Sequence, residues 1–220
     1  MRKKYSLGQE YIDKASRYHE DDQFLGWINL DGSGMGNSEG IRSLQFLSNL
    51  KSMIPAYLIL VTHEKTAGKL NPWDDYVDMS NAQIMYWGDA KASKNKRVDD
   101  FKGNKTLRAI FDYILTGSKD LVPPILHFSK PKAGIVKFNG LCVLDQLDIS
   151  WFDDHGTPVQ NYHAKLTILD CAEVSVDWLH NRVQSESLEL IDKHKDVPDS
   201  WLQYKKGKKS LAIYRKTRSI

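Results

Sequence analysis

The stretch IMYWGDAKASKNKRVDDFKGNKTLR, residues 84–108, combines three kinds of local sequence. A short apolar run ends in Tyr86 and Trp87, Gly88 and Asp89 follow, and a lysine-rich loop leads into an amphipathic segment. This order predicts a strand, a basic loop and a helix in succession. Lys and Arg side chains and the free amides of a helix N-terminus bind phosphates, and aromatic rings offer flat faces to a base. The stretch is therefore the best candidate for contact with a polyanion.

Positive charge is concentrated in this stretch and in one other. The chain has 31 Lys and Arg and 28 Asp and Glu. Residues 91–108 hold seven basic and two acidic residues, residues 205–218 hold seven basic and no acidic ones, and the rest of the chain has 17 basic and 26 acidic residues. Such a polarised field steers a protein toward a polyanion. The alternative for either stretch is a solvated loop or tail.

Length and composition indicate a soluble cytoplasmic protein with a full core. The chain has 220 residues and 41% apolar content, enough for one large domain. No apolar run approaches the roughly 20 residues of a membrane span, and the N-terminus lacks a signal peptide, so no membrane contact is expected. Cys142 and Cys171 match no CxxC pattern and are expected as buried thiols. The histidines form no metal-binding pattern, so neither a metal nor a cofactor is expected.

A helix is predicted directly after the basic loop. Gly103 and Asn104 precede it as a cap, and Gly117 is placed to end it. Its apolar residues recur at helical spacing on one face: Leu107, Ile110, Phe111, Ile114 and Leu115. A second helix is predicted from Ser175, followed by a polar helical stretch to about His194.

The rest of the chain has mainly the pattern of strands separated by turns. Residues 9–20 are weakly helical, and the glycine-rich loop 31–40 lacks the spacing of a nucleotide-binding loop. Strands are predicted at 24–30, 54–61, 82–87, 124–129, 134–138, 141–151 and 162–169, with turns at 130–131, 139–140 and 153–156. The pattern predicts an α+β fold, in which a curved β-barrel-like sheet has flanking helices.

Several short motifs, taken in order, resemble the N-terminal domain of AspBHI-type (MspJI-like) modification-dependent restriction endonucleases. The motifs are Tyr86-Trp-Gly-Asp89, Gly103-Asn104, Pro123-Pro-Ile-Leu-His-Phe128, Val136-Lys-Phe-Asn-Gly-Leu141, Gln160-Asn-Tyr-His-Ala-Lys-Leu-Thr-Ile-Leu-Asp170, Val174-Ser-Val-Asp-Trp178 and Pro198-Asp-Ser-Trp201. The resemblance implies an SRA-like DNA-recognition domain over residues 23–203, after a helical or polar extension at 1–22 and before a basic tail or linker at 204–220.

The family resemblance also implies a function. Such a domain finds a modified cytosine, usually 5-methylcytosine, in duplex DNA for a separate nuclease domain, and SRA-like domains flip that base into a pocket. The pocket residues would be Tyr86, Trp87 and Asp89, with the Asp89 carboxylate accepting from the cytosine amine. The DNA-backbone contacts would come from Lys91, Lys94, Lys96, Arg97, Asn104 and Lys105.

Alternatives remain for these residues. Successive strand residues face opposite sides, so only one of Tyr86 and Trp87 is expected to be available to a base. Asp89 could instead be a turn or cap residue. Asp89-Ala90-Lys91 also has the D-x-K form of a PD-(D/E)xK nuclease, which would bind Mg²⁺ with an upstream acid: Asp74, Asp75 or Asp78.

The expected partners follow from the same resemblance. They are double-stranded DNA that contains a modified cytosine, and a nuclease domain or subunit. Homo-oligomerisation stays open. So does the alternative that the domain binds phosphorothioate or unmodified DNA. No nuclease domain is recognised in the 220 residues, so the chain is not expected to be catalytic by itself.

Overall fold

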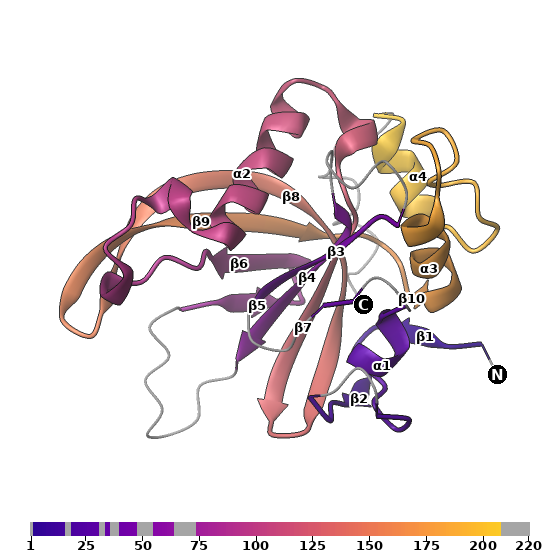
Figure 1. Cartoon of the computed structure of the whole chain (residues 1–220), viewed down its shortest axis with the longest axis horizontal. Coiled ribbons are helices and arrows are strands. Elements are labelled where there is room, and N and C mark those ends of the chain that lie inside the picture. Colours follow the sequence, from indigo (N-terminus) through magenta and orange to yellow (C-terminus); the bar gives the residue numbers. More distant parts are fainter. Residues whose placement is uncertain are drawn as a thin grey trace.

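The computed structural model of the chain describes residues 2–15, 19–30, 34–35, 40–47, 55–63 and 74–207. Within them the fold is α+β, with one large sheet, a small second sheet and few helices (Figure 1). The strands are β1 (Lys4–Ser6), β2 (Glu10–Ile12), β3 (Ile41–Gln45), β4 (Pro55–His63), β5 (Tyr76–Asp78), β6 (Gln83–Trp87), β7 (Ile125–Lys132), β8 (Ile135–Asp154), β9 (Thr157–Ile168) and β10 (Glu173–Ser175). The helices are α1 (Leu25–Ile28), α2 (Lys102–Leu115), α3 (Val176–Gln184) and α4 (Asp199–Lys205), with short 3-10 helices η2 (Ala92–Lys94), η3 (Val98–Asp100) and η4 (Lys119–Leu121).

The large sheet has the strand order β3-β4-β7-β8-β9-β6-β5, and β2 pairs with β8 beside this path. Strands β4 and β7 are parallel, and the other neighbours are antiparallel. Strands β1 and β10 form the second sheet. Among the described residues β3 and β5 are the two ends of the order and do not pair with each other, so no closed barrel is formed there. The predicted α+β class is confirmed.

The β8–β9 hairpin is the longest feature of the sheet. Its two-residue turn, His155-Gly156, has φ of 55° and 86°, and such turns require positive φ at both positions. Strand β8 continues through Asn139-Gly140, where a turn was predicted, and that prediction is wrong. Gly140 has φ of 134°, and the pairing with β7 shifts register there, so the glycine makes a bulge instead of a turn.

The N-terminal part differs from its prediction. A helix was expected over residues 9–20, but Glu10–Ile12 is strand β2, paired with β8. A strand was expected over residues 24–30, but Leu25–Ile28 is helix α1. The Asp22 carboxylate explains the second error, because its Oδ1 accepts from the amides of Phe24 (2.9 Å) and Gly26 (3.0 Å) at the start of α1.

Helix α2 confirms the predicted amphipathic helix. Leu107 and Ile110 are buried, whereas Leu115 is 67% exposed in the last turn. Helix α3 starts after Ser175 as predicted. The predicted helical continuation to about His194 is wrong, because the chain leaves α3 at Gln184. It turns back so that Asp192 pairs with the buried Arg182 guanidinium of α3.

The helices lie at two ends of the sheet (Figure 1). Helix α2 runs along the outer part of β8 and β9, while α1, α3 and α4 gather at the other end of the strands. Cys142 and Cys171 are buried thiols, as predicted. In the part of the chain that the structure describes, no helix is both long and apolar enough to span a membrane.

Candidate nucleic-acid interface

Strand β6 carries the two aromatic residues that the sequence singles out. Its side chains alternate between buried and half-buried positions, because successive residues of a strand face opposite sides of the sheet. Tyr86 is 3% exposed and belongs to the core, whereas Trp87 is half-buried. The expectation that one of the two rings points into the core is confirmed.

The Trp87 ring is held by residues of the β8–β9 hairpin. Its cross-strand partner is His163, and the two rings stack with centroids 4.4 Å apart and an interplanar angle of 25°. Phe152 lies 5.7 Å from the same indole. Burial lowers the pKa of His163, so the imidazole is neutral at pH 7. The stack therefore fixes the orientation of Trp87 with an uncharged ring on one side.

The Asp89 carboxylate lies at the N-terminus of α2. Its Oδ2 accepts from the Gly103 amide (2.8 Å) and its Oδ1 accepts from the Asn104 amide (3.0 Å). In return, the Asp89 amide donates to Asn104 Oδ1 (3.0 Å). Phe101, the residue at the N-cap position, makes no capping hydrogen bond with its side chain. Asp89 therefore caps the helix from 14 and 15 residues away and places a negative charge where the helix dipole favours it.

Two buried asparagines join this cap to the sheet. Asn104 and Asn161 are both 0% exposed. The Asn104 side-chain amide donates to Asn161 Oδ1 (3.0 Å) and to the Val98 carbonyl (2.8 Å), and Asn161 Nδ2 donates to the Gly88 carbonyl (2.9 Å). A fully buried side chain cannot reach a phosphate in this arrangement. The assignment of Asn104 to the DNA-backbone contacts is therefore corrected: it holds the β6–α2 connection together.

Gly88 is the position where this packing tolerates least change. A Cβ atom there would lie 1.9 Å from Asn104 Oδ1 and 2.6 Å from Asn161 Oδ1. We expect Gly88→Ala to displace both amides and to lower the free energy of unfolding by about 2 kcal/mol in a urea titration. Gly117→Ala is the control, because a Cβ there has open space and meets only the strain of a φ of 74°. Equal losses in the two variants would contradict the packing argument.

The segment between Asp89 and α2 is attached to the β8–β9 hairpin through one backbone amide and one carboxylate, and its basic side chains are exposed. The Ala92 amide donates to Asp154 Oδ2 at the tip of the hairpin (2.8 Å), and the Tyr162 hydroxyl of β9 donates to Asp99 Oδ1 (2.5 Å). Burial raises the pKa of Tyr162, so its hydroxyl keeps the proton that it donates. The exposed Lys and Arg side chains of this region form what we call the basic surface: Lys91, Lys94, Lys96, Arg97, Lys102, Lys105 and Arg108.

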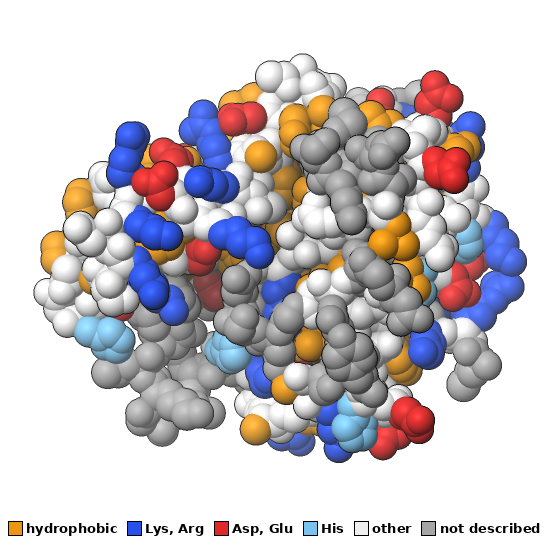
Figure 2. All heavy atoms as spheres, viewed as in Figure 1, with side chains coloured by type: hydrophobic (Ala, Val, Ile, Leu, Met, Phe, Trp, Pro, Cys, Tyr) orange, Lys and Arg blue, Asp and Glu red, His pale blue; other side chains and the backbone are white. Residues whose placement is uncertain are grey.

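Figure 2 shows the basic surface directly. Lys and Arg side chains gather over α2 and the η2–η3 segment, with acidic side chains between some of them. This set includes all the predicted phosphate-binding residues except Asn104: Lys91, Lys94, Lys96, Arg97 and Lys105. A cluster of exposed cations beside a half-buried aromatic residue suits a negatively charged polymer that carries flat bases.

One acid beside Trp87 was not assigned to base recognition from the sequence. Asp75, directly before β5, accepts from the Trp87 amide with Oδ1 (2.9 Å) and from the Thr62 hydroxyl with Oδ2 (3.1 Å). Burial raises its pKa to about 7, Asp74 adds to the rise, and the two hydrogen bonds oppose it. Acids with strongly shifted pKa values cluster at functional sites. The sequence signal was only an Asp-Asp pair, because the pairing of β5 with β6 brings Asp75 to Trp87.

The nuclease alternative finds no support in this geometry. Asp89 is engaged by α2, Asp75 by Trp87 and Thr62, and the Asp78 carboxylate by Ser80 and Asn81. Among the described residues, no three His, Cys, Asp or Glu side chains are arranged to hold a metal ion. Asp89 and Lys91 are thus not joined to an upstream acid in a common metal site.

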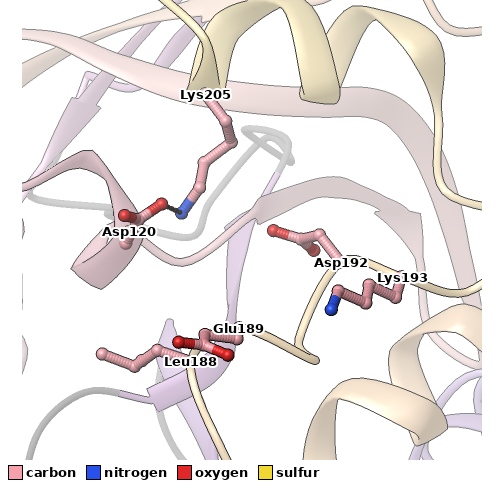
Figure 3. Close-up of a pocket in the computed structure, with 6 residues that line it drawn as sticks. All are labelled: Asp120, Leu188, Glu189, Asp192, Lys193 and Lys205. Carbon is pink, nitrogen blue, oxygen red and sulfur yellow. Dashed lines mark ion pairs between the residues drawn. The ribbon is translucent and has the colours of Figure 1, made fainter.

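A separate cavity of about 260 Å³ lies at the α3–α4 end of the molecule (Figure 3). Lys205 Nζ is 3.6 Å from Asp120 Oδ1 across it, and burial lowers the pKa of Lys205 to about 8. Its lining is charged and contains no aromatic side chain: Asp120, Leu188, Glu189, Asp192, Lys193 and Lys205. It therefore offers no stacking face for a base and is distinct from the site at the end of β6.

Comparison with known protein families shows the family of this chain. The family model described as "Restriction endonuclease AspBHI N-terminal" matches residues 5–216. The chain belongs to this family. A comparison with curated proteins finds no match. The fold of this AspBHI-type N-terminal domain is also similar to that of solved structures.

Three solved structures are similar to this AspBHI-type domain. The DNA modification-dependent restriction endonuclease AspBHI is 24% identical, with a TM-score of 0.73, over 93% of this chain and 51% of that one. The MspJI restriction endonuclease in complex with a 27-mer oligonucleotide is 19% identical, with a TM-score of 0.77, over 93% and 52%. The DNA recognition domain of the cytosine modification-dependent restriction endonuclease LpnPI is 25% identical, with a TM-score of 0.71, over 98% and 93%. The chain thus spans about half of AspBHI and MspJI and nearly all of the LpnPI recognition domain.

Proposed function

We propose that this chain binds duplex DNA at a modified cytosine, with 5-methylcytosine as the main candidate, and is the targeting part of a modification-dependent restriction endonuclease. The observation that carries the proposal is the junction at the end of β6, where the basic surface begins next to two half-buried residues, Trp87 and Asp75. Membership of the AspBHI N-terminal family supports it.

The basic surface supplies the contacts to the DNA backbone. Lys91, Lys94, Lys96, Arg97 and Lys105 are all exposed on one connected region. Each cation that neutralises a phosphate releases condensed counterions, so these contacts give affinity that falls with salt. They fix the register of the duplex and carry no sequence information themselves. Reading of the base must therefore come from the residues at the end of β6 beside the basic surface.

The base is read, in this proposal, after it leaves the duplex. Unstacking costs a few kcal/mol, and stacking on an aromatic ring returns about 1–3 kcal/mol, with hydrogen bonds to the base edge making up the rest. Trp87, oriented by His163, offers the aromatic face. Tyr86 points to the opposite side of β6, into the core, so it is not proposed as a stacking ring. Because Trp87 is adjacent to the basic surface in the chain, phosphates and the extruded base are bound close together.

Asp75 is a better acceptor for the cytosine amine than Asp89. Both carboxylates accept two hydrogen bonds, but those to Asp89 come from the α2 N-terminus and hold it in a structural cap. Asp75 is half-buried at the backbone of Trp87, and each of its oxygens accepts one hydrogen bond, so it keeps lone pairs for a further donor. Asp89 contributes by setting the position of α2 and of the basic surface.

The proposed organisation follows the family resemblance. Residues 23–203 form an SRA-like recognition domain with a curved, barrel-like sheet, and residues 1–22 are an N-terminal extension whose strands β1 and β2 pair with β10 and β8 of that domain. Helix α4 extends through Lys205, so the basic tail or linker toward a nuclease domain or subunit is proposed to begin after that helix. The complex would act on DNA in the cytoplasm.

A binding series tests the proposal. Fluorescence anisotropy would compare matched duplexes with cytosine, 5-methylcytosine, 5-hydroxymethylcytosine or a phosphorothioate linkage at one position, at fixed salt. We expect the 5-methylcytosine duplex to bind at least about tenfold more tightly than the plain one, which corresponds to about 1.4 kcal/mol. Equal Kd values across the series would leave a general electrostatic binder and defeat the proposal. Tighter binding of the phosphorothioate duplex alone would indicate that the chain recognises the modified backbone and not a modified base.

A further inference from the structure

We propose that His127 is a positioning residue for base recognition: acting through Thr62, it holds Asp75 as an ionised hydrogen-bond acceptor beside Trp87. This inference rests on the proposed function, because the acceptor matters only if Asp75 meets a base. It concerns residues on four strands or strand ends that lie far apart in the sequence and form one hydrogen-bonded chain.

The chain of contacts is continuous, and its members other than the half-buried Asp75 are buried. The Asn139 side-chain amide of β8 lies 3.0 Å from His127 Nδ1 on β7, and His127 Nε2 lies 3.0 Å from the Thr62 hydroxyl of β4. The Thr62 hydroxyl lies 3.1 Å from Asp75 Oδ2. His127 is 0%, Asn139 4% and Thr62 6% exposed. We call this set the Asn139–Asp75 relay.

The Thr62 hydroxyl fixes the direction of the relay. An ionised Asp75 can only accept, so the hydroxyl donates to it and the Thr62 oxygen is left to accept from His127 Nε2–H. His127 Nδ1 then carries a lone pair and accepts from the Asn139 amide. Burial lowers the pKa of His127 to about 3, so the ring holds one proton at neutral pH and this tautomer satisfies both nitrogens. Every donor in the relay thus points toward Asp75.

This direction favours the charged form of Asp75. A proton on Oδ2 would face the proton of the Thr62 hydroxyl, and the relay would have to reverse as far as His127. Oδ1 already accepts from the Trp87 amide, so a proton there would displace a second hydrogen bond. The relay therefore opposes the burial that raises the pKa of Asp75 to about 7.

Other charged groups around Asp75 act in known directions. Asp74, its neighbour in the chain, raises the pKa of Asp75. Tyr86 on β6 faces Asp75, and burial raises the pKa of its hydroxyl, so Tyr86 is neutral at pH 7. Arg42 on β3 and Asp89 both act on Tyr86, with opposite signs. His163, stacked on Trp87, has its pKa lowered from 6.5 by burial, whereas burial raises the pKa of Asp75 to about 7. A transition near pH 7 in base discrimination is therefore assigned to Asp75.

The binding test measures discrimination, the ratio of Kd for plain to 5-methylcytosine duplex, between pH 5.5 and 8.5. In the wild type we expect it to rise with pH, with a midpoint near the Asp75 pKa of about 7, because the ionised acid is the acceptor. Thr62→Val removes a hydrogen bond that stabilises the charge, so the midpoint should move up by about one pH unit and discrimination at pH 7 should fall about fivefold. His127→Leu should move the midpoint in the same direction by less. His127→Gln, whose amide can donate in place of Nε2–H, should restore it.

Thr167→Val is the matched control. Thr167 is a fully buried strand threonine whose hydroxyl donates to an acid, Asp145 (3.4 Å), on the β8–β9 pair and away from Trp87. A shift of the midpoint in Thr62→Val but not in Thr167→Val supports the relay. An unmoved midpoint in folded Thr62→Val, with discrimination intact in the wild type, overturns it. Equal affinity of the wild type for both duplexes is a different failure, that of the proposed function.

A measurement without DNA or substitutions covers the case in which the variants fail to fold. Long-range ¹H–¹⁵N spectra of the wild type report the tautomer of His127. The relay requires the Nε2–H form at pH 8, where Asp75 is ionised. The Nδ1–H form at that pH would reverse the hydrogen bonds and overturn the inference.

Discussion

Replacing Lys94, Lys96 and Arg97 together by Glu is expected to lower the affinity for every duplex, modified or plain, by about a thousandfold near 0.15 M salt. Each phosphate contact contributes a slope of about −0.9 to the dependence of log K on log salt, so losing three contacts should flatten that slope by almost three. The substitutions also place three like charges opposite phosphates. All three residues are exposed, so the fold should be unaffected. Anisotropy titrations at several salt concentrations measure both quantities.

A charge-matched control separates the basic surface from net charge. Lys132, Lys137 and Lys195 are exposed but lie on β7, on β8 and after α3, outside the basic surface. Their joint replacement by Glu changes the net charge by the same amount and should weaken binding far less. If the two triple variants lost affinity equally, the basic surface would not be the DNA face. Unchanged discrimination in the first variant would show that these residues hold the backbone and do not read the base.

Asp75→Asn is expected to abolish most of the discrimination between 5-methylcytosine and other bases in the pocket, a loss of about 2 kcal/mol in the binding of the modified duplex. Asn keeps the shape of Asp75, and its side-chain oxygen can still accept from the Trp87 amide. Its NH₂ group, however, would face the Thr62 hydroxyl and the cytosine amine, which are both donors. Affinity for the plain duplex, which rests on the backbone contacts, should change little. The comparison of Kd values for both duplexes at pH 8 measures the effect.

The matched control for this variant is Asp89→Asn. It removes the same charge but leaves an acceptor at the start of α2, so we expect a loss of stability of about 1 kcal/mol and nearly full discrimination. The reverse pattern, with discrimination lost in Asp89→Asn and kept in Asp75→Asn, would return the base contact to Asp89.

Much of the fold was predictable where a pattern is local. Helix α2 follows from apolar residues at helical spacing, and most strands follow from apolar runs. The errors have local and longer-range causes that apolar periodicity does not report. Asp22 caps α1 inside a sequence that reads as a strand, and Gly140 makes a bulge where Asn-Gly suggests a turn. Asp192 pulls the chain back to Arg182 where the sequence looked helical.

The site was predictable only in part. The exposed cations could be recognised from composition, and strand alternation indicated that one of Tyr86 and Trp87 faces the core. The burial of Asn104 and the contacts of Asp75 could not be recognised. Both depend on partners from distant strands, Asn161 on β9 for the first and Thr62 on β4 for the second. Sequence spacing carries no information about such contacts until the register of the sheet is known.

The most direct test of the account is a crystal structure of the chain bound to a duplex with one 5-methylcytosine. In that structure we expect the base to lie outside the helix stack at the end of β6, with the ring of Trp87 on its face and its exocyclic amine about 3 Å from an Asp75 oxygen. The basic surface should contact the flanking phosphates. A 5-methylcytosine that stays stacked in the duplex, or that is held in a pocket without Asp75 and Trp87, would contradict it.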